Sequence, residues 1–256
     1  MRVISINVNG IRSEGQPGLF DWLKKQDADV ICLQDTRASV TEMEQPSLQL
    51  DGYHQFAADA ENPSDGGVAI YCRLQPKAVI SSLGFDLADR HGRYLQADFD
   101  MVSIASLLLP SGQGSETKLN HKFKFMAELG QYLHKQRRKR RNCIYCSSLY
   151  IAHHEKDVNH CQDLEQQPGY LPSERQWLDQ IIHHLGYIDA LREHNSDAEQ
   201  FSWWPDADQN EPGCRFDYHL LSPGLRNCVR TVRTPGESRF RQHAAVIGDY
   251  DWTLSL

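Results

Sequence analysis

Short strand-like runs alternate with helical stretches along the chain, and this alternation limits the fold more than any other feature. The alternating residues 2–7 and the apolar run from Val30 to Leu33 are separated by a helical stretch. Further strand candidates are Gly67 to Tyr71, Tyr94 to Phe99, Ser103 to Leu109, Cys143 to Cys146, Phe216 to Leu221 and Ala245 to Asp249. No linker, repeat or break in composition interrupts them. We therefore expect one domain over residues 1–256, an α/β sandwich in which helices cover packed sheets.

Two amphipathic helices are predicted. The first runs from about Asn120 to Gln136 and has an apolar stripe of Phe125, Met126, Leu129 and Leu133. The second starts at a capping box of Ser173 and Gln176 and ends at Gly186, since glycine adopts the left-handed conformation that follows many helices. Its buried face consists of Trp177, Leu178, Ile181, Ile182 and Leu185.

Composition excludes several classes of protein. Of the 256 residues, 40% are hydrophobic and 24% are charged, which excludes a disordered or collagen-like chain. No window holds 18 consecutive apolar residues and the first ten residues carry a single Arg, so we expect no signal peptide, no membrane span and a cytoplasmic protein. The seven cysteines favour free thiols over disulfides. The net charge of -7 confines any nucleic-acid contact to a local basic patch.

Polar residues follow the first two predicted strands. Asn7 and Asn9 come at the end of the first, and Asp35 comes directly after the second. Ligands of sheet proteins gather at such edges, and a carboxylate is a suitable ligand for Mg²⁺. Asn and Asp are also common turn formers. The spacing alone leaves both a metal site and a pair of turns open.

Six motifs span nearly the whole chain in order: ISINVNGIR, ADVICLQDT, LLLPSG, SSLYIAH, CRFDYHLLSPGL and QHA. Together they resemble the exonuclease III and apurinic endonuclease family, of the endonuclease-exonuclease-phosphatase type. The resemblance implies a four-layer α/β sandwich, in which two packed sheets are flanked by helices. It also implies Mg²⁺-dependent cleavage of phosphodiesters at one edge of the sheets. That chemistry needs a carboxylate for the metal, a base for the water and a His held by an acid.

The resemblance assigns family positions to individual residues, and several of them differ in type from the family. Asn7 matches the family's first Asn, and Asp35 stands where the family has its metal-holding Glu. Leu108 stands where a Tyr contacts the phosphate. Ser148 and Tyr150 stand where the family has an Asp that prepares the water and an Asn that positions it. A Ser hydroxyl with no base beside it cannot accept a proton near neutral pH.

The C-terminal motifs imply a further loss. Asp217 retains a family acid and His243 retains the imidazole, whereas Gln242 replaces the Asp of a Ser-Asp-His sequence. Without that carboxylate, we expect the ring of His243 to lose its orientation and the support of its protonated form. These losses together predict negligible hydrolysis. We therefore expect a pseudoenzyme with a vestigial site, no bound metal and no cofactor.

Other segments resemble a regulatory branch of the same family: ADVICLQDTRAS, RLQPKAVIS, GRYLQADFD, KQRRKRR and QFSWWPD. That resemblance implies a co-repressor of translation in carbon catabolite repression, which works in a complex with the RNA chaperone Hfq and A-rich RNA. It also implies weak or no RNA binding alone, and no membrane partner. Two alternatives are a Mg²⁺-dependent abasic-site endonuclease and 3′-exonuclease in DNA repair, and a phosphodiesterase for small molecules.

The densest charge on the chain is the basic run, residues 135–141. It holds six cations: Lys135, Arg137, Arg138, Lys139, Arg140 and Arg141. One or two cations suffice to complement the dipole at a helix C-terminus, so six favour contact with phosphates or an acidic partner. We expect replacement of its four arginines with Ala to abolish complex formation and to leave thermal stability nearly unchanged.

A second basic stretch lies near the C-terminus and holds Arg226, Arg230, Arg233, Arg239 and Arg241. Arg230 and Arg233 are its candidate RNA contacts. Scattered arginines also serve separate surface ion pairs, and the sequence leaves both interpretations open. Neither stretch carries interleaved aromatic residues, which favours contact with the RNA backbone over reading of bases.

Two groups of metal-competent residues are expected to be structural. The loop at 153–160 holds His153, His154, Glu155, Asp157 and His160, which lack a fixed spacing and are predicted to be surface polar groups. Cys143 and Cys146 point to opposite faces of a predicted strand, which disfavours a zinc site.

Overall fold

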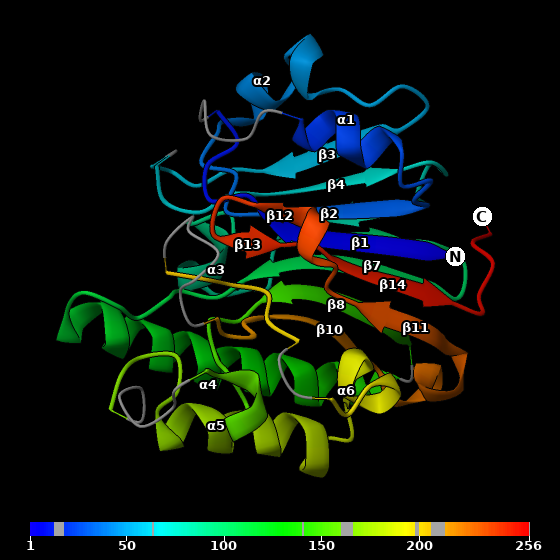
Figure 1. Ribbon diagram of the computed structural model, residues 1–256. Helices are drawn as coiled ribbons and strands as arrows, with labels where there is room; N and C mark the ends of the chain where they lie inside the picture. Colours follow the sequence, from blue (N-terminus) through cyan, green and yellow to red (C-terminus); the bar gives the residue numbers. More distant parts are fainter. Residues whose placement is uncertain are drawn as a thin grey trace.

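Two six-stranded sheets face each other in the computed structural model, which describes residues 1–12, 18–62, 64–139, 141–159, 166–197, 200–205 and 213–255 (Figure 1). The first sheet has the order β11 (Val229–Arg233), β14 (Val246–Tyr250), β1 (Arg2–Asn7), β2 (Val30–Gln34), β4 (Val68–Cys72) and β3 (His54–Ala58). The second has the order β5 (Ala78–Ile80), β6 (Tyr94–Asp98), β7 (Val102–Leu108), β8 (Asn142–Ser148), β10 (Asp217–Leu221) and β9 (Ile188–Asp189). A short hairpin pairs β12 (Arg239–Phe240) with β13 (His243–Ala244).

Helices cover the outer faces of both sheets. They are α1 (Leu19–Lys24), α2 (Val40–Met43), α3 (Asp86–Asp89), α4 (Glu116–Lys139) and α5 (Pro172–Asp179). Helix α6 (Ala190–His194) instead packs its buried residues into the layer between the sheets. Helices α1 and α2 pack on the first sheet, and α4 and α5 pack on the second (Figure 1). A third apolar layer fills the space between the sheets. This arrangement confirms the predicted four-layer α/β sandwich.

Each sheet contains a parallel pair of strands joined through a helix. Strands β1 and β2 are connected through α1, and β7 and β8 through α4. Parallel neighbours need such a crossover, and it brings their carboxyl ends to the same edge. The last residues of these strands are Asn7, Gln34, Leu108 and Ser148. This edge, where the two sheets meet, is called the catalytic edge below, after the position that the family resemblance implies for the site.

Buried polar side chains join the sheets to each other. Gln34 Nε2 donates a hydrogen bond to Ser106 Oγ across the interface at 2.9 Å. The His219 ring lies between Ser5 Oγ at 3.0 Å and the Tyr250 hydroxyl at 2.7 Å. Burial lowers the pKa of His219 to about 3, so the ring is neutral at pH 7. Buried polar groups need partners, and these contacts therefore fix how the sheets align.

The two predicted helices are present, but their starts differ from the prediction. Helix α4 begins at Glu116 and not near Asn120. Helix α5 begins at Pro172, whose fixed φ suits the first helical position, so the capping box at Ser173 is wrong. Backbone N–H groups before the helix donate to the Glu174 carboxylate instead. The chain continues as a π-helical segment, Gln180–His184, and Gly186 follows it with φ 77°.

Two expectations from composition concern membranes and disulfides. Among the helices that the structure describes, none is both long and apolar enough to span a bilayer. The cysteines within the described ranges form no disulfide, and Cys161 lies outside those ranges.

Candidate functional site

The catalytic edge brings several predicted site residues into contact. Asn7 is fully buried, and its Nδ2 donates to Ser148 Oγ at 3.0 Å and to the Tyr150 hydroxyl at 2.8 Å. Asn7 Oδ1 accepts from the backbone N–H of Asn9 at 3.0 Å. Leu108 is buried and pairs in register with Ser148. Asn7, Ser148 and Tyr150, which are far apart in the sequence, thus form one hydrogen-bonded cluster, and Leu108 is its apolar neighbour.

Asp35 lies at this edge in an ion pair that the sequence analysis missed. Arg37 donates from Nη2 to Asp35 Oδ2 at 2.7 Å and from Nε to Oδ1 at 3.2 Å. Burial lowers the pKa of Arg37, but the bonds to Asp35 outweigh it and the net shift is upward. Pairs in which both oxygens accept are among the strong hydrogen bonds in proteins. A cation at Asp35 would therefore compete with the guanidinium of Arg37.

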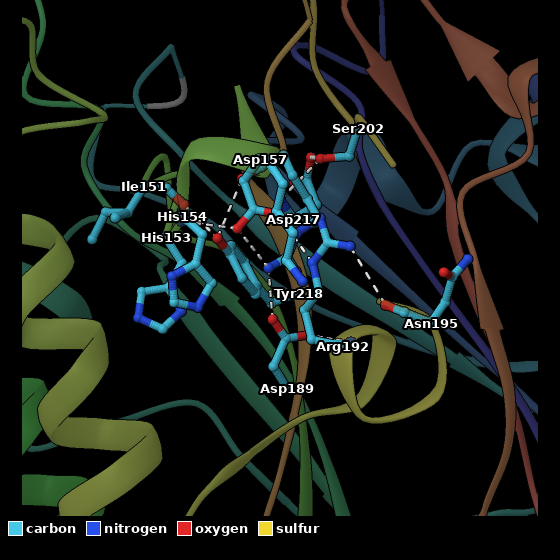
Figure 2. Close-up of polar contacts among 12 residues, drawn as sticks. Ile151, His153, His154, Asp157, Asp189, Arg192, Asn195, Ser202, Asp217 and Tyr218 are labelled. Carbon is cyan, nitrogen blue, oxygen red and sulfur yellow. Dashed lines mark hydrogen bonds and ion pairs between the residues drawn. The ribbon is translucent and has the colours of Figure 1, made fainter. Parts of the chain in front are cut away.

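His243 has an acidic partner, contrary to the prediction. Its Nδ1 lies 2.9 Å from Oδ2 of Asp217, and both side chains are about 2% exposed. Ser202 Oγ donates to the same oxygen at 2.7 Å, and Figure 2 shows the two side chains together. Gln242, the neighbour in sequence, instead accepts from Asn9 Nδ2 at 2.7 Å. An ionised carboxylate only accepts, so Asp217 orients the ring of His243 and leaves its Nε2 for another partner.

Tyr150 lies between Asn7, which donates to its hydroxyl, and the pair of His243 and Asp217. Its ring lies 6.0 Å from that of His243 and 6.1 Å from that of Phe216. Burial, and then the charge of Asp35, raise the pKa of Tyr150, so the phenol stays protonated near neutral pH. A cavity of about 420 Å³ adjoins this aromatic group and is lined in part by Phe216 and Trp203.

Backbone strain is concentrated at this edge. Six non-glycine residues among those described have positive φ, and five of them lie here: Asn9, Asp35, Arg37, Tyr150 and Arg241, with φ between 45° and 57°. A left-handed backbone is unfavourable for residues with a Cβ and is frequent at functional sites. The strain supports the placement of the candidate site at this edge.

A largely buried ionic network supports the strand that carries Asp217. Arg215 Nε donates to Asp157 Oδ1 at 2.8 Å, and its Nη2 donates to Asp189 Oδ2 at 2.6 Å. Arg192 also donates to Asp157 (Figure 2). The guanidinium of Arg215 lies 4.2 Å from the ring centre of Tyr218. The network ties the loop at 154–157 and helix α6 to β10.

The loop at 153–160 therefore differs from the prediction. Asp157 is fully buried, and His153 is buried with its Nε2 2.8 Å from Asp179 Oδ1, so neither is a surface group. His160 lies outside the described residues. Within the part of the chain that the structure describes, no group of three or more His, Cys, Asp and Glu is arranged to hold a metal ion.

The basic run lies at the far end of β8 from the catalytic edge. Strand β8 starts at Asn142, beside the run, and ends at Ser148, so about 20 Å separates the two places at 3.3 Å per residue. Arg141 donates to Ser103 Oγ at 2.6 Å and to backbone carbonyls of the β6–β7 turn. It therefore holds that turn in place, so we expect that replacing Arg141 lowers stability, and the expectation of nearly unchanged stability applies better to the other arginines of the run. Arg140 lies outside the described residues.

The remaining basic residues differ in their pairing. Lys135, Arg138 and Lys139 are exposed at the end of α4. Arg230 is paired with Asp251 at 2.7 Å, which matches the interpretation as a surface ion pair. Arg233 is exposed on the edge strand β11.

Comparisons with known proteins agree on the family. The model of the endonuclease/exonuclease/phosphatase family matches residues 4–249. An exodeoxyribonuclease of Bacillus subtilis (strain 168) is 26% identical over 251 residues, 96% of this chain and 98% of that protein. Exodeoxyribonuclease III of Haemophilus influenzae is 28% identical over 247 residues, 90% of this chain and 91% of that protein. An AP endonuclease structure from Archaeoglobus fulgidus has a TM-score of 0.87 at 22% identity, over 98% of this chain and 100% of that one.

The names of these relatives concern the prediction that the chain is not an enzyme. Both bacterial proteins are named as nucleases, which contradicts the expectation that the chain is not an enzyme. The assignment of Ser148, Tyr150 and Gln242 to changed catalytic positions stays a prediction. From the match over residues 4–249 and the shared fold, we conclude that the chain belongs to the endonuclease/exonuclease/phosphatase family.

Proposed function

We propose that this chain is a regulator of the catabolite repression control (Crc) type, which represses translation in a complex with Hfq and A-rich RNA. The observation that carries the proposal is the exposed basic end of α4. Lys135, Arg138 and Lys139 are exposed there, on a surface separate from the catalytic edge. Clustered cations that repel one another gain little from the helix dipole and bind phosphates well.

The same surface supports a dependence on a partner. Lysine and arginine side chains contact phosphates without reading the sequence, and no aromatic residue stands between the cations from Lys135 to Arg141. Backbone contact of this kind is weak on its own and falls steeply with salt. A second protein such as Hfq would supply the selection of A-rich RNA.

A second candidate function is a metal-dependent nuclease for abasic sites or 3′ ends in DNA. A specific observation favours it: the pair of His243 and Asp217, because an imidazole oriented by a carboxylate can stabilise developing charge. The bacterial relatives named as exodeoxyribonucleases favour it as well. Binding of a metal at Asp35 would require Arg37 to release this carboxylate.

One experiment separates the two candidates. We expect a gel shift with A-rich RNA that gains a further, slower band only when both this chain and Hfq are present. The same sample is incubated in Mg²⁺ with an oligonucleotide that carries one abasic site. Cleavage at that site without the slower band would overturn the first candidate in favour of the nuclease.

The basic surface itself is tested by a matched pair of variants. We expect Arg138→Gln/Lys139→Gln to weaken assembly with Hfq and RNA at least tenfold, because two phosphate contacts are lost. The control, Lys24→Gln/Lys25→Gln, removes the same charge from exposed positions at the end of α1 and should leave assembly within about twofold. Thermal melting checks that both variants keep the parent stability. Equal weakening by the two pairs would contradict the assignment of this surface.

A further inference from the structure

A second cavity lies beside the basic run, at the end of β8 that is remote from the catalytic edge. Its volume is about 230 Å³, and it is enclosed by the end of α4, the starts of β7 and β8, and the turn at 222–224. Arg137 and Arg141 line it. Ser148, at the catalytic edge, is the last residue of β8, so the cavity and the candidate site are distinct places.

The walls of this cavity are aromatic and polar. Tyr145 and Tyr187 are buried, and their rings meet edge to face at 5.9 Å. Gln96 and Asn142 add neutral amides. No Asp or Glu is among the described residues that line the cavity. Asp98 lies behind the wall, where it accepts from Gln96 Nε2 and Ser103 Oγ, both at 2.6 Å, and is 3.8 Å from Arg141. Guanidinium and amide groups without a carboxylate favour an anionic ligand.

The two arginines contribute differently. Arg141 is bound to the protein, since its Nε donates to Ser103 Oγ and its Nη2 to the Phe99 carbonyl, both at 2.6 Å. Arg137 uses only its Nε, which donates to the Leu185 carbonyl at 2.9 Å. Its two terminal nitrogens donate to none of the described residues. The bond from Nε fixes the plane of the guanidinium and leaves its two terminal nitrogens available to a ligand. Two such donors in one plane suit two oxygens of one phosphate.

We propose that this cavity binds the phosphate group of a nucleotide, with Arg137 as the donor and the tyrosine wall against the ribose or base. The volume is just below the range of about 300–1,000 Å³ that is common for small-molecule sites, which suits a single nucleotide unit. The phosphate can belong to a free nucleotide or to one unit of an RNA strand. This inference deepens the proposed function and rests on it for the RNA source.

The test measures binding of AMP and of adenosine by titration calorimetry. We expect AMP to bind and adenosine, which lacks the phosphate, to bind at least tenfold more weakly. Arg137→Gln should weaken AMP binding at least tenfold. Lys24→Gln, which removes the same charge from an exposed position at the end of α1 and away from the cavity wall, should change it less than threefold. Asn142→Asp adds a carboxylate to the wall and provides a second variant that should also abolish AMP binding.

Competition distinguishes the two sources of the phosphate. Displacement of AMP by a six-residue oligoadenylate would support an RNA strand, and AMP binding without such displacement would support a free nucleotide. Failure of both AMP and the oligoadenylate to bind, or equal weakening by Arg137→Gln and Lys24→Gln, would overturn the proposal. A slower band with Hfq in the gel shift would still support the proposed function, so the two ideas fail separately.

Discussion

Replacing Lys122 with Met is expected to lower the free energy of unfolding by about 3–5 kcal/mol. Lys122 Nζ lies 2.5 Å from Glu174 Oε1, and both side chains are fully buried. Burial lowers the pKa of Lys122, while the charge of Glu174 acts in the opposite direction. Without the ammonium, an uncompensated carboxylate would remain between α4 and α5. Domains are typically stable by only about 5–15 kcal/mol, so the loss would be a large fraction of the total.

Urea unfolding measures this effect, and two variants control it. The double variant Lys122→Met/Glu174→Gln should recover much of the loss, because a neutral amide can still accept from the backbone N–H groups of Gly169 and Leu171. Lys118→Met, at an exposed position one turn earlier, should change stability by less than about 0.5 kcal/mol. A loss below about 1 kcal/mol in the single variant would show that the buried pair does not have the expected role.

Lys122 also links packing to the candidate site. Its Nζ donates to the Tyr150 carbonyl at 2.7 Å. Tyr150 has a positive φ of 50°, a conformation that needs support from its surroundings. The bond to α4 supplies such support, so the helix that packs on the second sheet also positions the residue in the middle of the catalytic edge.

The sequence predicts the inner strands of this fold and misses the outer ones. The eight predicted strands correspond to the four inner strands of each six-stranded sheet, and the missed β3, β5, β9 and β11 are the edge strands of these sheets. The short hairpin of β12 and β13 is missed as well. Inner strands such as β2 and β4 are buried on both faces and therefore read as continuous apolar runs. The three residues of strand β5 are all exposed and β9 has two residues, so neither produces a periodic signal.

The candidate site is predictable only where it follows the ends of strands. Asn7 and Ser148 end their strands, and their contact follows from the topology once the sheets are recognised. The partner of His243 could not be read from its neighbour Gln242, because Asp217 lies on another strand. The pairing of Arg37 with Asp35 depends on a left-handed backbone at both residues, which has no sequence signal in residues other than glycine.

Replacing Arg215 with Met is expected to have an effect of similar size, about 3–5 kcal/mol at pH 7. Arg215 is fully buried and neutralises two carboxylates, Asp157 and Asp189, that would otherwise be left in the interior with only Arg192 nearby. Urea unfolding at pH 7 measures the loss. Arg226→Gln, which breaks an exposed pair with Glu193, is the control and should cost less than about 1 kcal/mol.

The pH dependence of this loss distinguishes an electrostatic cause from a packing cause. Burial raises the pKa of Asp157, but Arg215 and Arg192 outweigh it and hold the pKa well below its ordinary value. Stability from this carboxylate is therefore fully present above the unfolded pKa near 4 and is lost as the pH falls through the folded value. In Arg215→Met only Arg192 still opposes the effect of burial, so the pKa of Asp157 in the folded variant is higher than in the parent. The variant therefore loses less stability on acidification than the parent does. We expect the difference between the two proteins to shrink from pH 7 to pH 3, and a constant difference would assign the effect to lost packing around Tyr218.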